Sequence, residues 1–444
     1  MKKDVRNTVN YHTNITENTD KNLKNARKPS AESDHSDRKA LKAADQAVKC
    51  SAAGKCGGCD WLERPYEKQL QDKKMLVEEL LKPYCRLEGI LPMETPYFYR
   101  NKVHAVFGRD RRGNIIAGTY EKNSHRVVPV EKCLIEDEKA GEIIRTIRDL
   151  CLSFKMKIYD EDSGYGLLRH VLIRAGRQTG QYLVVLVLSS PILPNKNNFI
   201  KALCGAHPEI TSVVLNVNDR RTSMILGDKE QVLYGKGYIE DMLCGKTFRI
   251  SPKSFYQVNP TQTEKLYRKA IEYADFHGNE RIVDAYCGIG TIGIVASDYV
   301  REVIGVELNK EAVRDARVNA RLNGARNISF YENDAGQFLK QMAGQKARVD
   351  AVILDPPRSG SDEEFLTAVV EISPAKILYI SCNPQTLARD LKFLTGKGYR
   401  AQKACAVDMF PQTAEHVETC VLLTKSKQQI RPDERFMKEE RRFI

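Results

Sequence analysis

The strongest constraint on the fold is a regular alternation of strand-like and helix-like segments that begins near residue 250. The apolar run RIVDAYCG is followed by the helix-like TIGIVASDY, and VIGVEL is followed by NKEAVRDARVNARLNG, which Gly324 closes. Further strand-like runs are ISFYEND, VDAVILDPP, AKILYISCNP and CVLLTK. Strands that alternate with helices indicate a parallel, doubly wound α/β sheet, so we predict a Rossmann-like fold for this part of the chain.

The part of the chain before residue 249 has a different pattern. Short apolar runs follow one another, separated by Gly, Asp and Asn: HAVFGRD, IAGTYEK, HRVVPV, LRHVLIRAG, QYLVVLVLSS, SVVLNVN and SMILGD. One helix, roughly Glu138 to Met156, interrupts them, and another is expected from Tyr66 to Leu81, where Pro83 ends it. Short strands separated by turn residues predict a sheet-rich domain of mixed α+β type.

Composition divides the chain into five predicted segments. The first 48 residues are rich in Asn, Lys, Asp, Ser and Thr, and so polar a segment cannot bury enough surface to offset its ordering entropy. The last segment, KSKQQIRPDERFMKEERRFI, is also highly charged. The predicted segments are a disordered polar tail at 1–48, a cysteine-bearing segment with its helix at 49–90, a sheet-rich central domain at 91–248, the doubly wound domain at 249–425 and a charged tail at 426–444.

Charge and cysteine usage narrow the class of protein. The net charge is +12, from 70 basic and 58 acidic residues, which favours a polyanionic partner such as RNA or DNA. No apolar run is long enough to span a bilayer, and the N-terminal MKKDVRNTVNYHTNIT lacks the apolar core of a secretory signal. We therefore expect a cytoplasmic protein in which reduced cysteines serve a metal, catalysis or the core.

A glycine-bearing turn after the first strand of the doubly wound half predicts a nucleotide site. In Asp284-Ala-Tyr-Cys-Gly-Ile-Gly290, Gly288 and Gly290 allow the backbone to turn tightly against a ligand. Glu307 ends the next strand, where an acid accepts hydrogen bonds from ribose hydroxyls, and Asp334 ends the third, where it can reach an adenine amino group. The turn lacks the third glycine of a dinucleotide site. The pattern resembles class I S-adenosylmethionine methyltransferases, with NAD as the alternative ligand.

Two further strand ends carry side chains suited to catalysis. Asp355-Pro-Pro-Arg follows the fourth strand, and a similar element in amino-methyltransferases grips a planar nitrogen acceptor. Cys382 follows the strand AKILYI and so faces the same crevice, although an isolated cysteine is often simply buried. Glu418 directly precedes the last strand, which in this fold lies close to the strand of Cys382. A thiol and a carboxylate are therefore expected to meet at this edge of the sheet.

From about residue 250 to 425 the chain resembles the bacterial RNA uracil-5-methyltransferase family. The matching motifs are Phe255-Tyr-Gln257-Val-Asn259, Asp284-Ala-Tyr-Cys-Gly-Ile-Gly290, Asp355-Pro-Pro-Arg-Ser-Gly360, Tyr379-Ile-Ser-Cys382-Asn-Pro-Gln-Thr-Leu-Ala-Arg-Asp390, Asp408-Met-Phe-Pro-Gln-Thr413 and His416-Val-Glu418. The resemblance implies that Cys382 attacks C6 of uracil and that Glu418 removes the C5 proton. It also implies a pocket for cofactor and uracil lined by Gln257, Tyr286, Glu307, Asp334 and Asp355.

A cysteine-rich stretch near the N-terminal end forms a candidate metal site. Cys50, Cys56 and Cys59 follow the pattern C-x5-C-x2-C among glycines, and Cys133 is the candidate fourth ligand. Four thiolates suit a [4Fe–4S] cluster or zinc, and three close ligands with a distant fourth favour the cluster. The spacing differs from the C-x3-C-x2-C of radical S-adenosylmethionine enzymes, so we expect a structural or RNA-contacting cluster.

The same cysteine arrangement occurs in the branch of the family that modifies 23S rRNA and binds such a cluster. The resemblance therefore implies 23S rRNA as the partner, with a tRNA loop uridine as the alternative. Many members of that branch begin with a small β-barrel RNA-binding domain, which the polar first 48 residues do not match. RNA capture then falls to the central domain and to the basic residues Arg100, Lys102, Arg109, Arg111 and Arg112. An amino-methyltransferase and an inactive iron–sulfur RNA-binding module remain open, and no membrane or obligate protein partner is indicated.

Overall fold

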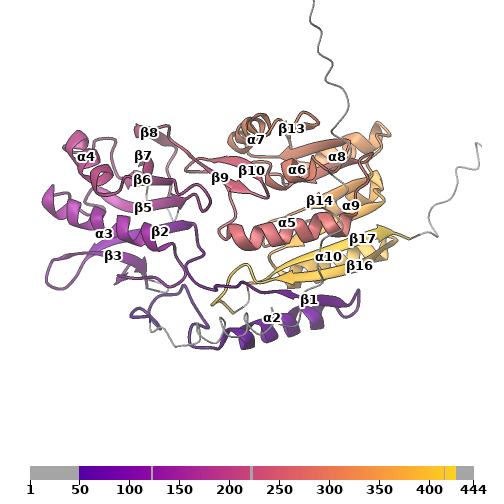
Figure 1. The fold of residues 1–444 in the computed structure, drawn as a ribbon, viewed down its shortest axis with the longest axis horizontal. Coiled ribbons are helices and arrows are strands. Elements are labelled where there is room, and N and C mark those ends of the chain that lie inside the picture. Colours follow the sequence, from indigo (N-terminus) through magenta and orange to yellow (C-terminus); the bar gives the residue numbers. More distant parts are fainter. Residues whose placement is uncertain (1–49, 122–123, 221–223, 415, 427–444) are drawn as a thin grey trace, which may run out of the picture. The chain divides into compact units, whose positions relative to one another are not determined.

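The computed structural model describes residues 50–121, 124–220, 224–414 and 416–426. The predicted N-terminal tail (1–48) and residues 427–444 of the predicted C-terminal tail lie outside this range. The described residues form an eight-stranded sheet, a seven-stranded sheet and a two-stranded hairpin (Figure 1). None of their helices is long and apolar enough to cross a membrane.

The eight-stranded sheet has the order β1-β16-β17-β15-β14-β11-β12-β13. Its strands are β1 (Leu87–Leu91), β11 (Arg281–Ala285), β12 (Glu302–Glu307), β13 (Ile328–Glu332), β14 (Ala351–Leu354), β15 (Lys376–Ser381), β16 (Tyr399–Val407) and β17 (Glu418–Lys425). The pairs from β13 to β15 are parallel, and β17 runs antiparallel to both β15 and β16. Because the strand order reverses between β11 and β14, a crevice opens beyond the carboxyl ends of these strands, where α/β proteins bind ligands.

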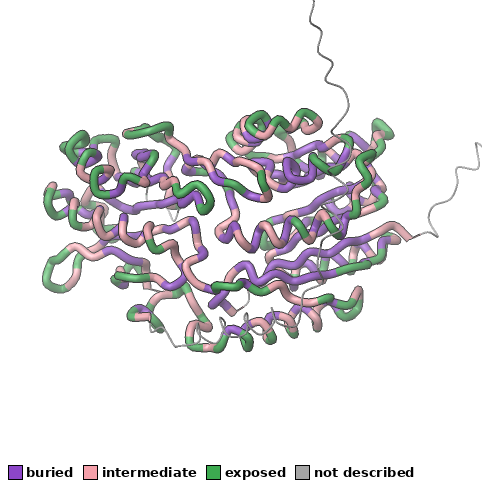
Figure 2. Tube along the Cα trace, viewed as in Figure 1, coloured by how far each residue is buried: buried purple, intermediate pink, exposed green. Residues whose placement is uncertain are grey.

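Helices cover both faces of this sheet, as parallel crossover connections require. They are α2 (Tyr66–Leu81), α5 (Pro260–Ala274), α6 (Thr291–Ala296), α7 (Lys310–Leu322), α8 (Ala335–Gly344), α9 (Glu363–Ile372) and α10 (Pro384–Gly396). One apolar layer is formed with α5, α6 and α7 and the other with α2, α8, α9 and α10, so the central strands are buried (Figure 2). The predicted doubly wound α/β sheet is confirmed.

The seven-stranded sheet has the order β4-β3-β2-β5-β6-β7-β8. Its strands are β2 (Lys102–Arg109), β3 (Ile115–Tyr120), β4 (Val127–Pro129), β5 (Leu168–Ala175), β6 (Tyr182–Leu188), β7 (Ile210–Val217) and β8 (Lys229–Gly235). Only β6 and β7 pair in parallel within this sheet. The helices α3 (Glu138–Ser153) and α4 (Lys196–Ala206) pack their apolar residues against one face. This confirms the predicted sheet-rich α+β region.

Several elements differ from the sequence prediction. The run SMILGD was expected to be a strand, but residues 224–228 form a loop because the buried Asn218 side chain donates hydrogen bonds to the Met224 and Ile225 carbonyls. The short helix α4 was not predicted, since it starts at Asn195 with no side-chain cap. The hairpin β9 (Ile239–Leu243) and β10 (Lys246–Ile250) and the edge strand β1, which pairs with the distant β16, were also not predicted.

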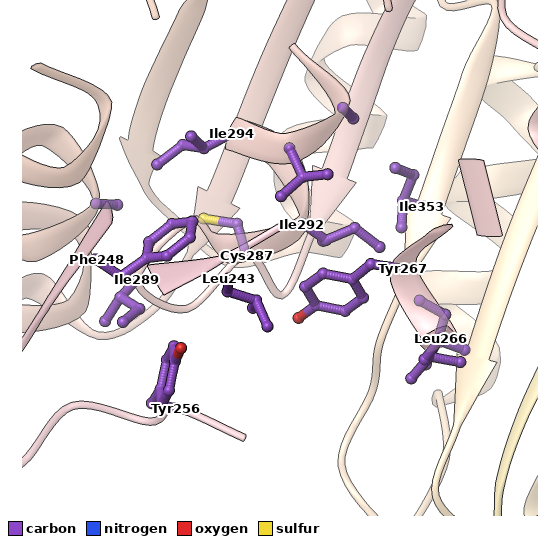
Figure 3. Packing of buried hydrophobic residues seen from close by; sticks show 14 of the residues in the cluster. Leu243, Phe248, Tyr256, Leu266, Tyr267, Cys287, Ile289, Ile292, Ile294 and Ile353 are labelled. Carbon is purple, nitrogen blue, oxygen red and sulfur yellow. The ribbon is translucent and has the colours of Figure 1, made fainter. Parts of the chain in front are cut away.

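One apolar cluster joins the seven-stranded sheet to the doubly wound half. It includes Leu172 and Leu183 of the first, Leu243 of the hairpin and Tyr267 of α5. Figure 3 shows Leu243 and Tyr267 within this packing. The Tyr267 hydroxyl lies 2.9 Å from Oγ1 of Thr291, the first residue of α6. The turn between β11 and α6 therefore rests on a well-packed core.

Candidate active site

The turn between β11 and α6 adopts a conformation that glycine favours. Tyr286, Gly288 and Gly290 have positive φ angles of 68°, 55° and 82°. A Cβ on Gly290 would lie 2.8 Å from the Phe330 ring, so this position has no room for a side chain. Gly290 is buried against Phe330, whereas Gly288 is half-buried at the carboxyl edge of the sheet.

Glu307 ends β12 and lies against this turn. Its Oε2 accepts a hydrogen bond from the Gly288 N–H at 3.0 Å, and its Oε1 accepts one from the Asn309 N–H at 2.8 Å. Together with Phe255, these residues line a cavity of about 130 Å³. An acid at the end of the second strand, beside the glycine turn, is well placed to bind ribose hydroxyls.

Five of the seven predicted cofactor residues lie outside the lining of this cavity: Gln257, Tyr286, Gly290, Asp334 and Asp355. Asp334 caps α8, where its Oδ1 accepts a backbone hydrogen bond at 2.9 Å. The Tyr286 ring packs against Phe365, with ring centroids 5.1 Å apart. The Gln257 carbonyl accepts a hydrogen bond from Asn101 Nδ2 at 3.1 Å, which ties this segment to the start of β2. Gly288 and Glu307 are therefore the two predicted cofactor residues that share this cavity.

The register of β15 and β17 places Cys382 beside Glu418. Ser381, the last residue of β15, is the cross-strand partner of Thr419, so the antiparallel register makes Cys382 and Glu418 the next pair. Side chains opposed in this way have Cβ atoms about 4.5–5.5 Å apart. Cys382 is half-buried and Glu418 is buried. The structure thus brings together the thiol and the carboxylate that the sequence predicted to meet.

Asp355 joins this pair from the neighbouring strand. It follows β14, whose last residue, Leu354, pairs in parallel with Tyr379 of β15. Burial raises the pKa of Asp355; burial and the Asp355 charge raise the pKa of Glu418, and Arg358 opposes that rise. Glu418 Oε2 has no hydrogen-bond partner among the described residues. This oxygen is therefore not committed to any described group of the protein.

The Cys382 thiol is protonated at neutral pH in this environment. Burial raises its pKa to about 11; the Glu418 and Asp355 charges add to the rise, and Arg358 opposes it. Since the thiolate is the nucleophilic form of cysteine, the thiol must lose its proton as it attacks. The adjacent carboxylates are the groups that can accept this proton.

A buried hydrogen-bond network, not assigned from the sequence, supports these strand ends. Asp390 accepts hydrogen bonds from the Tyr379 hydroxyl at 2.6 Å, the Ser361 N–H at 2.9 Å and Arg389 Nε at 2.7 Å. Arg389 Nη2 also donates to the Ser359 and Ser361 carbonyls. The network fastens the loop after β14 to the helix after β15. Its only sequence signal was the adjacent Arg389 and Asp390, whose partners are distant in the chain.

The four predicted metal ligands gather around one cavity. Cys50, Cys56, Cys59 and Cys133 all line a cavity of about 650 Å³. Burial and the neighbouring thiols raise the pKa of Cys59 to about 12, and burial raises the pKa of Cys133 to about 12. Among the described residues, no three His, Cys, Asp or Glu side chains are arranged to hold a metal ion. The four thiols therefore share one cavity.

The predicted RNA-contacting basic residues separate into two groups. Arg109, Arg111 and Arg112 are exposed at and after the end of β2. Arg100 and Lys102 are half-buried and line the cysteine cavity. Burial and nearby arginines lower the pKa of Lys102 to about 8. Positive charge thus lies both on the surface and at the wall of the cavity.

Comparison with known proteins identifies relatives along most of the chain. Residues 223–426 match the family model described as tRNA (Uracil-5-)-methyltransferase. The chain is 40% identical over 379 residues to an uncharacterized RNA methyltransferase from Halalkalibacterium halodurans, which covers 84% of this chain and 82% of the relative. It is 42% identical over 380 residues to an uncharacterized RNA methyltransferase from Caldanaerobacter subterraneus, and this match covers 85% of this chain and 84% of the relative.

The fold also matches a solved structure. The Pyrococcus abyssi tRNA (uracil-54, C5)-methyltransferase, in complex with S-adenosyl-L-homocysteine, is 28% identical with a TM-score of 0.71, over 84% of this chain and 86% of that one. This confirms the predicted class I S-adenosylmethionine methyltransferase fold with a further sheet-rich region. The chain therefore belongs to the RNA (uracil-5-)-methyltransferase family.

Proposed function

We propose that this chain transfers a methyl group from S-adenosylmethionine to C5 of a uracil in RNA, through a covalent bond between Cys382 and C6. The observation that carries the proposal is the register that sets Cys382 opposite Glu418, with Asp355 on the adjacent strand. These groups lie at the same sheet edge as the glycine turn and Glu307. Membership of the uracil-5 family supports this assignment.

The cofactor is assigned to the cavity beside the glycine turn. Gly288 gives the cofactor close access to the backbone, Gly290 allows the turn to pack against Phe330, and Glu307 binds the ribose hydroxyls. Asp334, at the start of α8, is assigned to the adenine amino group. Gln257 and Tyr286 are assigned to the wall between cofactor and uracil. Gln257 is held by Asn101, and Tyr286 packs against Phe365.

The proposed chemistry uses the thiol and the carboxylates in sequence. Cys382 Sγ adds to C6 as its proton passes to a neighbouring carboxylate, and the electrons of the C5–C6 double bond move toward C5 and O4. C5 then uses these electrons to form a bond to the methyl carbon, and the pair of the broken carbon–sulfur bond stays on the sulfur. Glu418 accepts the proton from C5, the double bond re-forms and Cys382 leaves as a thiolate. A base within folded RNA must leave its stack to reach this half-buried thiol.

The proposed substrate is 23S rRNA, which is methylated in the cytoplasm. The support is the C-x5-C-x2-C pattern with a distant fourth cysteine, since all four residues line one cavity. A tRNA uridine is the second candidate, because the similar Pyrococcus abyssi enzyme is a tRNA (uracil-54, C5)-methyltransferase.

We further propose a [4Fe–4S] cluster held by Cys50, Cys56, Cys59 and Cys133. The donor set fits, because all four thiols line one cavity of about 650 Å³ and four thiolates are the usual ligands of such a cluster. When bound, the cluster provides a rigid cross-link between the cysteine-bearing segment and the loop before α3. Zinc uses the same donors, so metal analysis distinguishes the two.

Tritium release tests the function directly. RNA carrying 5-tritiated uridine, as a 23S rRNA transcript and a tRNA transcript, is incubated with S-adenosylmethionine, and release should occur from the rRNA. Release from tRNA alone would overturn the rRNA assignment but keep the chemistry.

The matched control for the nucleophile is Cys85→Ala. Cys85 is half-buried like Cys382, and burial also raises its pKa to about 11. Cys382→Ala should abolish release while retaining cofactor binding, and Cys85→Ala should retain both. Release from neither RNA by a cofactor-binding protein would contradict C5 methylation.

A further inference from the structure

The loop between β16 and β17 delivers Glu418 to the active site. It leaves β16 after Val407 and returns at Glu418, and these two residues are cross-strand partners. Glu418 is therefore the first residue of its strand, directly after the loop. The position of its side chain depends on what holds the loop at residues 408–417.

A buried ion pair holds the start of this loop to α2. Lys73 Nζ donates to Asp408 Oδ1 at 2.7 Å and to the Phe410 carbonyl at 2.9 Å. Both charged side chains have 0% exposure. A buried ion pair adds little net stability compared with apolar residues of similar size, but it disfavours alternative arrangements that separate the charges. Here it favours one placement of the loop relative to the helix.

A second set of contacts holds the tip of the loop. Gln69 Nε2 donates to Gln412 Oε1 at 2.8 Å, and the Gln412 N–H donates to Gln69 Oε1 at 3.0 Å. The Asp60 and Trp61 N–H groups both donate to the Gln412 carbonyl at 3.1 Å. Gln412 has a φ of +71°, a conformation that L-residues rarely adopt. These partners therefore hold a strained loop residue in place, and two of them, Asp60 and Trp61, lie directly after Cys59.

The opposite side of the loop contacts the start of α5. Asn259 Nδ2 donates to the Met409 carbonyl, and Gln262 Nε2 donates to the Asp408 carbonyl, each at 3.0 Å. Asn259 follows Gln257 closely in the segment assigned to the cofactor pocket. The loop is thus held between the cofactor segment and the cysteine-bearing segment.

We infer that α2 and residues 60–61 form a clamp that positions Glu418 for removal of the C5 proton, with Gln69 and Lys73 as positioning residues. The clamp consists of the contacts from Asp60, Trp61, Gln69 and Lys73 to residues 408–412. The inference rests on the proposed role of Glu418. It also links the cysteine-bearing segment to catalysis. Asp60 and Trp61 follow Cys59 and donate two backbone hydrogen bonds to Gln412, so a fixed position of Cys59 helps to fix the loop that carries Glu418.

The test uses variants that remove the clamp but keep the fold. Lys73→Met alone would leave Asp408 buried without its counter-charge, so we choose the neutral pair Lys73→Met with Asp408→Leu, and separately Gln69→Met. Tyr399→Phe is the matched control, since it removes a buried 2.9 Å hydrogen bond to the Pro374 carbonyl at the far end of the same strand, β16. Thermal unfolding and cofactor affinity are measured for every variant.

The decisive readout is the rate of tritium release relative to the rate of adduct formation, measured in single-turnover reactions with 5-tritiated RNA. Both clamp variants should form the methylated adduct but release tritium about 10- to 100-fold more slowly, because small displacements of a catalytic group cost this much. Denaturation-resistant protein–RNA adduct should therefore accumulate, whereas Tyr399→Phe should behave like the wild type. Folded clamp variants in which adduct formation and tritium release fall together, or neither falls, would overturn the clamp. A wild type that forms no adduct would overturn the proposed function, and the clamp with it.

Discussion

Replacing Glu418 with Gln should make the Cys382 thiol more acidic. Its pKa rises from 9.0 to about 11, with burial as the largest cause and the Glu418 charge as the next. Removal of the Glu418 charge should therefore lower the pKa of Cys382 by part of this rise, and each unit of lowering increases the thiolate fraction about tenfold. The pKa of Glu418 is itself raised, so its charge is present only at higher pH. The two proteins should react alike near neutrality and diverge as pH rises.

Iodoacetamide alkylation from about pH 7 to about pH 10 measures this difference, since only the thiolate reacts. Peptide mass spectrometry separates Cys382 from the other cysteines, and Cys85 in the same sample is the internal reference. Glu418→Gln should alkylate faster at Cys382 only in the upper part of this range, with unchanged rates at Cys85. Equal Cys382 rates at every pH, or faster reaction of the wild type, would refute the juxtaposition of thiol and carboxylate.

Three further predictions follow from the site. Asp355→Asn removes a like charge from beside Glu418, so Glu418 should ionise at lower pH. The rising limb of the pH dependence of adduct decay should then move to lower pH, and an unmoved limb would argue against coupling between Asp355 and Glu418. Gly290→Ala should weaken cofactor binding in calorimetry and lower the free energy of unfolding by about 1–3 kcal/mol, because its Cβ meets Phe330, whereas Gly278→Ala, at φ +90° with open space, should leave cofactor binding unchanged. Cys133→Ser should lose iron and acid-labile sulfide, and Cys204→Ser, on α4, should retain both; zinc without iron in the wild type would contradict the cluster.

The sequence predicted best those features that depend on neighbours along the chain. Residues Tyr66 to Leu81 were predicted as a helix from local periodicity and the following proline, and α2 has these bounds. Glu307 was placed at a strand end because parallel strands finish at one edge, and it contacts the glycine turn there. Both features follow from local spacing and from the regular geometry of the doubly wound fold.

Features that depend on distant partners were not visible in the sequence. Lys73 reads as one more solvated charge on a helix, yet it is buried because Asp408 meets it from the far end of the chain. The run SMILGD has the composition of a strand, but the Asn218 side chain holds residues 224–228 of it as a loop. Asp334 was assigned to a ligand, and only the structure shows that it also caps α8.

The central claim is that Cys382 forms a covalent bond with the uracil it methylates. The most direct test incubates the enzyme with S-adenosylmethionine and an RNA in which the target uridine carries fluorine at C5, because no base can remove fluorine as a proton and the adduct cannot decay. Mass spectrometry of the digested complex should find a methylated, fluorinated nucleotide attached to the Cys382 peptide, and none with Cys382→Ala. Methylation of ordinary RNA together with an unmodified Cys382 peptide in the fluorinated complex would contradict the account.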